Sequence, residues 1–457
     1  MLFSALFKWR MVLPLIVLLV SSVAFGAATS QSAFAKRSSS APKTFVSFST
    51  FLKNTSIARY QDYASQRGSR GVQSEQAFTE MRSYILHMYA GVKQVSSFVL
   101  DSQYFDCITV SSQPTVHYLH IKQIAKPPQV STQTTAGKDS THSSIRASRS
   151  PLALGQKDEF GNPIACKDGT IPMERITLER MSKFHTLHDF LAKEPGGRGT
   201  HSPASQSCDN PHCYAHAFQS VTNYGGNSLL NLWNPNPNGG FSLSQHWYAG
   251  GTGDNTQTAE GGWINYPDKF GTQLSVLFIY YTADNYKNTG CYNLDCTAFV
   301  QINNNWTLGG PFDHYSSYGG DQYGFTLQYK YYQGNWWLFL KGSGDYEAVG
   351  YYPGSIYNNG QLASNAQEVD YGGETYTSGS DLPQMGSGNF ASQGWQQAAF
   401  QNTIFYIPRD ENGGTGVWTD LTPNQTNTNC YTIIVTPSSS GGDWGTYFYF
   451  GGPGGNC

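Results

Sequence analysis

Positive charge is scarce in the second part of this 457-residue chain. Residues 205–457 hold 5 Lys and Arg against 18 Asp and Glu, a net of −13, whereas residues 1–204 hold 23 against 13, a net of +10. The two values sum to the formal charge of −3. This balance offers no basic surface for bulk attraction to nucleic acid or to a membrane. It also shows that the two parts of the chain differ in kind.

Long apolar runs are equally scarce. The only one approaching membrane length runs from Met11 to Val20, follows Lys8 and Arg10, and continues with small residues to a candidate cleavage site at Ala33–Ala35. This pattern predicts a signal peptide over residues 1–35 and a secreted, extracellular protein, with an uncleaved anchor as the alternative. After signal removal we expect no membrane association.

The part that follows is expected to be a smaller α+β pro-segment over residues 36–204. Pro and Gly dominate Lys193–Pro203, which predicts an open linker that a protease can reach. The other expected features are, in order, a Ser-rich leader (36–60), a helix (74–92), two strands (98–110 and 116–121), a flexible insertion (126–150) and a second helix (177–192).

Residues 205–457 are rich in Gly, Tyr and Trp, and nothing in them predicts a helix of useful length. Residues 273–282 form an apolar run, which is typical of a strand buried on both faces. Between Phe325 and Tyr331 apolar and polar residues alternate, which predicts a half-buried strand followed by a hairpin into Trp336–Leu340. Many short strands with Gly-rich turns predict a mainly β protein with an antiparallel β-sandwich as its catalytic domain.

Glutamate is rare in this second part, where only five occur. Two of them, Glu260 and Glu374, stand beside a Gly-Gly pair with an aromatic residue nearby. Glycines would let a substrate backbone approach, and aromatic walls can raise the pKa of a carboxyl group. Two carboxyls facing one cleft can act as general base and general acid. Alternatively, both are structural acids bonded to neighbouring hydroxyls.

Several motifs resemble the neprosin family of glutamic peptidases, and they occur in that family's order from about Cys107 onward. They are Glu260-Gly261-Gly262-Trp263, Gly290–Cys296, Tyr371-Gly372-Gly373-Glu374 and Gln384–Gly388, preceded by Cys166–Pro172, which resembles the end of the family's activation segment. The resemblance implies a β-sandwich whose concave face holds Glu260 and Glu374 as the catalytic pair, and cleavage after proline. Tyr371, where the family often has Trp, and the 126–150 insertion depart from the pattern.

Eight cysteines in an exported chain are expected to form disulfides. Cys291 with Cys296 and Cys208 with Cys213 would close short loops, and Cys430 with Cys457 would fix the C-terminus. The resemblance implies the first and last of these pairs and leaves Cys107 with Cys166, while the pairing of Cys107, Cys166, Cys208 and Cys213 stays open. A metal site built from Cys208, His212, Cys213 and His216 is the alternative; its spacing is not that of a zinc site.

The sequence thus predicts a secreted, acid-active glutamic endopeptidase that cuts after proline and is made as a latent precursor. Trp263, Tyr266, Tyr371 and Gln384 are candidate substrate contacts, while Ser387 is expected to be a turn residue. We expect no cofactor, no metal and a monomer, with proline-rich proteins or peptides as substrates and the pro-segment as an intramolecular inhibitor. The alternatives are a β-sandwich glycoside hydrolase and a carbohydrate-binding module.

Overall fold

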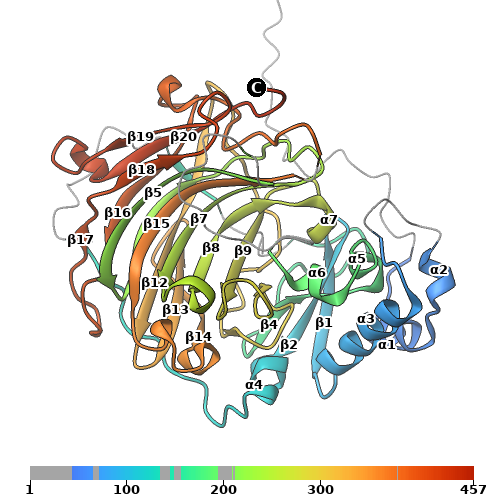
Figure 1. The fold of residues 1–457 in the computed structure, drawn as a ribbon. Coiled ribbons are helices and arrows are strands. Elements are labelled where there is room, and N and C mark those ends of the chain that lie inside the picture. Colours follow the sequence, from blue (N-terminus) through green and yellow to red (C-terminus); the bar gives the residue numbers. More distant parts are fainter. Residues whose placement is uncertain are drawn as a thin grey trace, which may run out of the picture.

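The computed structural model describes residues 44–64, 71–133, 145–148, 156–193, 208, 211–377 and 379–457. The expected signal peptide and all of the expected linker after Lys193 lie outside these residues, so both stay predictions. The described part is mostly β: two large antiparallel sheets face each other, and a smaller α+β unit lies at one side (Figure 1). No helix in the described ranges is long and apolar enough to cross a bilayer. The predicted fold class is therefore confirmed.

The first large sheet has seven strands in the order β10-β9-β8-β7-β15-β5-β18. In this sheet β7, β8 and β9 follow one another as antiparallel neighbours, and β15 lies between β7 and β5, antiparallel to both. A short helix, α7, lies between β8 and β9. The bounds are β5 His212–Asn223, β7 Phe241–Gly250, β8 Gln257–Asn265, α7 Pro267–Phe270, β9 Val276–Thr282, β10 Cys291–Tyr292, β15 Ala366–Tyr376 and β18 Thr422–Gln425.

The second large sheet has ten strands. Eight follow the order β11-β14-β13-β12-β6-β16-β20-β19, while β17 pairs with β16 and β3 pairs with β12. The predicted hairpin is present, with its turn at Gln333 and Gly334 between β12 and β13. The bounds are β3 Ile145–Ala147, β6 Gly225–Asn231, β11 Val300–Gln301, β12 Gln322–Tyr332, β13 Asn335–Lys341, β14 Glu347–Pro353, β16 Ala399–Tyr406, β17 Val417–Trp418, β19 Thr432–Thr436 and β20 Tyr447–Gly451.

The two sheets approach closely at the Gly-Gly pairs beside the two glutamates. A Cβ on Gly261 would lie 3.2 Å from the Tyr329 ring, and one on Gly373 would lie 2.6 Å from the Phe450 ring, both in the opposite sheet. One glycine of each pair is therefore needed for sheet-to-sheet packing. Since side chains alternate along a strand, Glu260 and Glu374 point away from the opposite sheet.

The upstream unit combines helices with a three-stranded sheet, β1-β2-β4. The first predicted helix is confirmed: α3 begins after Ser74, whose hydroxyl caps the Ala77 amide. Residues 116–121, expected to be a strand, instead begin in helix α4, because Pro114 favours the first helical turn. The second predicted helix is two short ones. The bounds are α1 Phe48–Ile57, α2 Tyr60–Ala64, α3 Glu75–Met88, β1 Gln94–Leu100, β2 Gln103–Thr109, α4 Pro114–Tyr118, β4 Thr170–Glu174, α5 Leu178–Met181 and α6 Leu187–Leu191.

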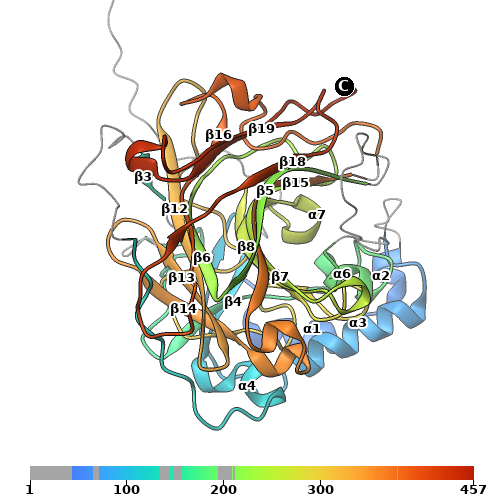
Figure 2. The ribbon, with the colours of Figure 1, turned by 60° about the vertical axis from the view of Figure 1, so that its left-hand side comes forward.

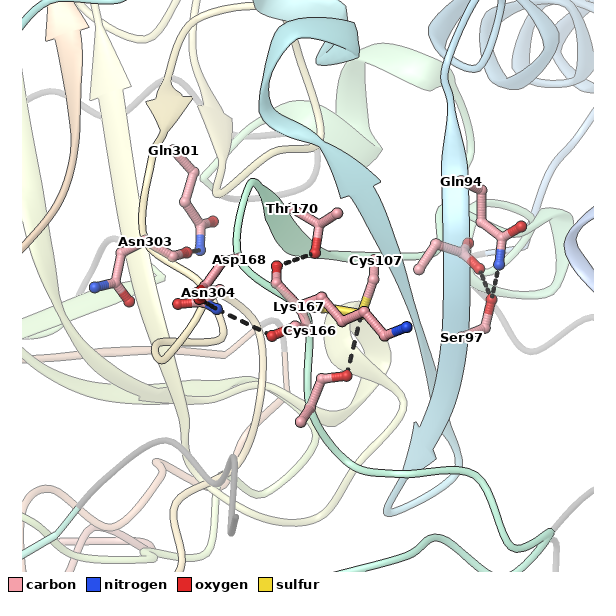
Figure 3. The surroundings of a disulfide bond; sticks show 12 residues. Gln94, Ser97, Cys107, Cys166, Lys167, Asp168, Thr170, Gln301, Asn303 and Asn304 are labelled. Carbon is pink, nitrogen blue, oxygen red and sulfur yellow. Dashed lines mark hydrogen bonds between the residues drawn. A yellow bond between two sulfur atoms is a disulfide. The ribbon is translucent and has the colours of Figure 1, made fainter. Parts of the chain in front are cut away.

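Four disulfides join all eight cysteines in the expected pairs: Cys107–Cys166, Cys208–Cys213, Cys291–Cys296 and Cys430–Cys457. The first links β2 to the segment before β4. Figure 3 shows it beside a loop of the second large sheet, where the Asn304 side chain donates to the Cys166 carbonyl at 3.0 Å. The Cys107–Cys166 disulfide is internal to the upstream unit and lies where that unit meets the sandwich.

The expected flexible insertion is partly anchored. Residues 113–133 and 145–148, here called the arm, lie along the outer face of β12, β13 and β14, where β3 adds a parallel strand to β12 (Figure 2). The Ser131 amide donates to the Gln328 side chain at 2.8 Å, and the Gln328 amide returns a bond to the Ser131 carbonyl at 3.0 Å. Polar residues of β12 that were expected to face solvent are thus buried under the arm.

Candidate active site

Glu260 on β8 and Glu374 on β15 lie on the same face of one sheet, with β7 between their two strands. In the strand register, Glu260 of β8 pairs with Trp247 of β7. Gln245, also of β7, lies opposite Gly262 of β8 and Gly372 of β15. Both glutamates are buried, with exposures of 0% and 1%. The structure therefore brings together the two residues that the sequence singled out.

One nitrogen atom joins the two carboxylates. Lys193 Nζ lies 2.6 Å from Glu260 Oε2 and 2.8 Å from Glu374 Oε2, and its side chain is 7% exposed. The ring of Trp247 lies 5.3 Å from the same nitrogen, which adds a cation–π contact. Lys193 was expected to begin an unanchored linker; that expectation is wrong, because the end of the upstream unit enters the site.

Glu374 has two further partners. His212 Nδ1 lies 2.7 Å from Glu374 Oε1, and the Gln245 amide donates to Oε2 at 3.2 Å. Burial alone would raise the pKa of Glu374, but the Lys193 ammonium and the bond with His212 outweigh it and lower the pKa to about 2. Glu374 is thus held as a carboxylate while Lys193 is in place.

Glu260 accepts bonds from two hydroxyls as well. Thr258 donates to Glu260 Oε1 at 2.7 Å, and Tyr286 donates to the same atom at 2.6 Å. Burial, and then the charge of Glu260, raise the pKa of Tyr286 well above its usual value, so its proton stays available for donation. The two glutamates therefore have different surroundings, as a division of acid and base roles requires.

A hollow of about 490 Å³ continues from this pair along the same sheet face. Trp247 is its shared wall, since its ring contacts Lys193 Nζ and also lines the hollow together with Tyr214, Phe218 and Asp370. His216 Nδ1 lies 2.7 Å from Asp370 Oδ2 within it. Although burial opposes it, the neighbouring Asp370 raises the pKa of His216.

Three of the expected substrate contacts, Trp263, Tyr371 and Gln384, have hydrogen-bond partners outside the glutamate site. Trp263 donates from its indole to the Asn231 carbonyl, and the Tyr371 hydroxyl reaches the Phe405 carbonyl, so both side chains face the opposite sheet. Each residue stands three positions from its glutamate and thus lies on the other face of the strand, so their role as substrate contacts stays a prediction. Gln384 instead bonds with Asn236 in a turn, and Ser387 accepts from the Asn389 amide, as a turn residue does.

Tyr266 remains a candidate, although the upstream unit covers it. Its ring centroid lies 5.5 Å from that of Phe241 and 6.4 Å from that of Phe184, which precedes α6. The ring of Phe241 also lies 5.8 Å from the ring of His212. Tyr266 is therefore connected to the glutamate pair through two rings rather than by direct contact.

The residues of the alternative metal site serve other roles. Cys208 and Cys213 form a disulfide, while His212 faces Glu374 and His216 faces Asp370. Among the described residues no group of three or more His, Cys, Asp or Glu side chains is placed to hold a metal.

The upstream unit also contacts the sandwich through buried charged groups at the edge of the site. Arg180 of the upstream unit places Nη2 3.8 Å from Asp295 Oδ2 and donates from Nε to the Lys269 carbonyl at 3.0 Å. Lys269 also donates to the carbonyl of Phe190 in α6. Burial raises the pKa of Glu174 to about 7, despite the opposing charge of Arg180. Charged groups of both units thus meet away from water.

Sequence reasoning missed Lys193, His212, Gln245, Trp247 and Tyr286. Only alternation along the strands offered a signal. Once the register of β5 and β15 is known, His212 is a diagonal neighbour of Glu374. Once the register around β7 is known, Trp247 lies opposite Glu260, and Gln245 is a diagonal neighbour of both glutamates. That register depends on long-range pairing, which local patterns do not reveal.

Comparison with known families identifies the larger part of the sandwich. Residues 238–453 match the family model described as Neprosin. The matched region includes Glu260, Glu374, Gln245 and Trp247, and so most of the glutamate site, whereas Lys193 and His212 lie upstream of it.

Solved structures of glutamic peptidases resemble the matched region and its surroundings only distantly. Scytalido-glutamic peptidase with a transition state analog inhibitor has 11% identity and a TM-score of 0.31, covering 52% of this chain and 97% of that one. SCP-B, a member of the Eqolisin family in complex with the tripeptide Ala-Ile-His, has 8% identity and a TM-score of 0.27 over the same shares. Likenesses this weak carry no argument about the site.

Proposed function

We propose that this protein is a secreted, acid-active glutamic endopeptidase that cleaves after proline and is made as a latent precursor. One observation carries the proposal: a single nitrogen atom contacts one oxygen of each glutamate, at 2.6 and 2.8 Å, in the region that matches the Neprosin family model. The neprosin match supports a peptidase of the glutamic class. Proline selectivity, acid activity, secretion and latency are parts of the proposal.

The position of Lys193 Nζ is where a water molecule would sit once the lysine has left. There it would contact both carboxylates, so an ionised glutamate could take its proton while a protonated one polarises the peptide carbonyl. Two carboxyls this close resist ionising together, and a pair sharing one proton persists in acid. Tyr286, His212 and Gln245 hold the carboxyls in fixed positions through the contacts given above.

Latency follows from the position of Lys193. Its ammonium neutralises both carboxylates and occupies the place of the water, so neither proton transfer nor substrate entry is available while it stays. The carbonyl of Lys193 also accepts a bond from Tyr292 at 2.9 Å, which holds the backbone as well as the side chain. The region following Lys193 was predicted to be the linker, so cleavage there would free the lysine to leave.

The extended hollow favours a peptide over a smaller substrate. It continues from the glutamate pair along β7, β15 and β5 and is walled by aromatic rings, which suits several consecutive residues of an extended chain. Selectivity for proline rests on the family resemblance; Tyr286, which contacts Glu260, and Trp247, which contacts Lys193 Nζ, are aromatic side chains at the pair.

The proposal is tested by exposing the precursor to about pH 4 and offering peptide libraries, with polysaccharides as a parallel substrate class. We expect cuts enriched after proline, read by mass spectrometry, and loss of these cuts in Glu260→Gln. Cuts without enrichment after proline would remove the specificity. Hydrolysis of polysaccharide but not peptide would replace the function with that of a glycoside hydrolase.

A further inference from the structure

We propose that the arm is a second docking element, independent of the glutamate pair, which keeps the pro-segment bound to the outer face of β12–β14 after the linker is cut. The pro-segment would then withdraw Lys193 from the site without leaving the molecule, and the active form would contain two chains. The inference rests on the proposed function only for its premise that the linker is cut.

Strand β13 requires a cover on its outer face. Trp336, Leu338 and Leu340 point into the sandwich core, so the side chains between them point outward, and yet Trp337 and Phe339 are 1% and 3% exposed. An apolar run buried on both faces indicates a strand with structure on each side. In this protein the arm provides the structure on the outer side.

The cover is an apolar cluster in its own right. Val116 of the arm packs with Trp337, Phe339, Tyr351 and Val300, and other arm residues extend the contact. These partly buried arm residues are Ile121, Ile124, Ala125 and Val130. Loss of the arm would expose two large aromatic side chains and their neighbours as one patch, which soluble monomers seldom tolerate.

Strand β12 also requires the arm, because the buried polar side chains on its outer face find hydrogen-bond partners there. Lys330 is 0% exposed, and its ammonium donates to the Ser131 hydroxyl at 2.7 Å and to the Gly413 carbonyl. Gln328, also 0% exposed, exchanges two bonds with the Ser131 backbone. The Ser131 hydroxyl also donates to the Gly413 carbonyl, so removing Ser131 would break four hydrogen bonds with Gln328, Lys330 and Gly413. Buried polar groups that lose their hydrogen-bond partners cost free energy.

Hydrogen bonds to backbone groups of the sandwich hold the arm at residues 113 and 132. Thr132 forms a parallel bridge with Thr415, with the Thr132 amide donating to the Gly414 carbonyl at 3.0 Å and the Gly416 amide donating to the Thr132 carbonyl at 2.9 Å. At the start, the Gln113 side chain bonds both the amide and the carbonyl of Gln301, at 2.9 and 2.8 Å. With β3 on β12, the arm is held at three separate places.

Few of these contacts titrate between neutral pH and about pH 4. The charged or titratable groups at the arm include Asp313, which accepts from Ser148 and lies 3.4 Å from His314 Nδ1, and Asp321, which pairs with exposed Arg146. They also include Lys330, near Asp410 and Glu411, and the arm's own His117 and His120. Burial lowers the pKa of Lys330 to about 8, so its charge is constant below neutral pH. The remaining contacts are apolar or join neutral groups. The Lys193 site, by contrast, consists of two carboxylates and an ammonium.

The disulfide makes the arm inseparable from the rest of the pro-segment. Cys107 and Cys166 close a loop of 59 residues in sequence separation that contains the whole arm, and this bond lies where the upstream unit meets the Asn304 loop (Figure 3). Whatever holds the arm therefore also holds β2 and the segment leading to β4. A cut in the linker alone leaves this connection intact.

The test uses the full chain with a recognition site for a sequence-specific protease placed between Lys193 and Cys208, in a Glu260→Gln background that prevents self-cleavage. The cut protein is run by size exclusion at about pH 7 and about pH 4, so the readout needs no peptidase activity. We expect the pro-segment to co-elute with the catalytic domain at both pH values, and equally so when Lys193→Ala removes the contact with the glutamates.

Variants of the arm give the matched comparison. Val116→Asp places a charge in the apolar cluster and should weaken retention about tenfold or more, whereas Arg146→Ala removes only an exposed ion pair and should co-elute like the parent. If Val116→Asp fails to fold, Gln113→Ala replaces it. Complete separation of the unmodified pro-segment at about pH 4, or retention that is lost in Lys193→Ala, would overturn the proposal without affecting the proposed peptidase activity.

Discussion

Lys193 and Glu260, 67 residues apart in sequence, form a contact of 2.6 Å in which the lysine belongs to the upstream unit and the glutamate to the sandwich. The same lysine reaches Glu374 at 2.8 Å. A single side chain thus determines the charge of the site, its accessibility and the attachment of the pro-segment's last described residue.

Replacing this lysine should release the site from its own chain. In Lys193→Met the two glutamates lose their shared ammonium, and repulsion between two buried carboxylates should favour uptake of one proton. We expect the uncut precursor of this variant to cleave a proline-containing peptide in acid without the delay expected of the native precursor. Lys167→Met, which changes an exposed lysine, is the matched control. An unchanged delay in Lys193→Met would show that other contacts maintain latency.

The two glutamates should each be required for turnover. Glu260→Gln and Glu374→Gln keep the shape of the side chain but remove proton transfer, so kcat should fall on the order of 10²–10⁴. Glu347→Gln and Glu411→Gln, which lie away from the site, should keep near-normal activity. Steady-state rates of the acid-treated proteins, with circular dichroism as a check on folding, measure the effect. Near-normal turnover in Glu260→Gln or Glu374→Gln would mean that the pair is wrongly assigned.

Departure of Lys193 should accelerate only in fairly strong acid. The pKa of Glu374 is lowered from 4.5 to about 2 while Lys193 is bound, so the stabilisation is complete above 4.5 and is lost as the pH falls toward 2. Over that window the docking of Lys193 should weaken by up to about tenfold per pH unit. Glu174 acts in the opposite direction: its pKa is raised to about 7, so it favours the docked state increasingly as the pH falls from 7 to 4.5.

Sequencing of new N-termini over a pH series measures this window. We expect little processing between about pH 7 and pH 5 and a steep rise below about 4.5. The rise should move to higher pH in Lys193→Met, which has no ammonium to release and depends only on the acid activity of the pair. Processing that reaches its full rate near pH 6 would contradict control by Glu374.

The interior of the sandwich should lose stability in the same acid range. His246 is buried between Ser228, at 2.6 Å, and Tyr248, at 2.9 Å, and burial lowers its pKa to about 3. Because the unfolded chain binds a proton near pH 6.5 and the folded chain does not, the free energy of unfolding should fall as the pH drops from 6.5 to 3. The loss from this residue is on the order of 1 kcal/mol per pH unit at most.

Denaturant unfolding at about pH 6.5 and about pH 4 checks this in the native chain and in His246→Gln, which keeps hydrogen-bonding groups but does not titrate. The variant should show a smaller difference between the two pH values, even if it is less stable at both. An equal difference in the two proteins would rule His246 out as a source of the acid sensitivity.

Local patterns predicted most of the strands, because these depend on composition and alternation. Cysteine spacing and the family resemblance indicated the disulfides, and the resemblance singled out Glu260 and Glu374, which the structure places together. The inward direction of Trp263 and Tyr371 was also available from alternation, since each is an odd number of positions from its glutamate. The position of Lys193 was not: Pro and Gly after it indicate a linker, and no local signal reveals that the side chain before them is bound by two distant carboxylates.

The polar face of β12 shows a second limit of the sequence. Gln328 and Lys330 alternate with apolar residues and therefore predict a solvated face, which is correct for an isolated sheet. They are buried because a segment about 200 residues earlier covers them, as the separation of 197 between Ser131 and Gln328 shows. Patterning reports polarity, whereas burial of polar groups depends on partners brought by the rest of the chain.

The occupied site also determines how activation proceeds in time. While Lys193 lies between Glu260 and Glu374, a molecule has no free site with which to cut its own linker, so any cut made in this docked state must come from another molecule whose lysine has already withdrawn. The early reaction is then second order in protein, and each product molecule adds to the attacking population. A dilute precursor would show a long lag, a concentrated one a short lag, and a trace of activated protein would abolish the lag in both.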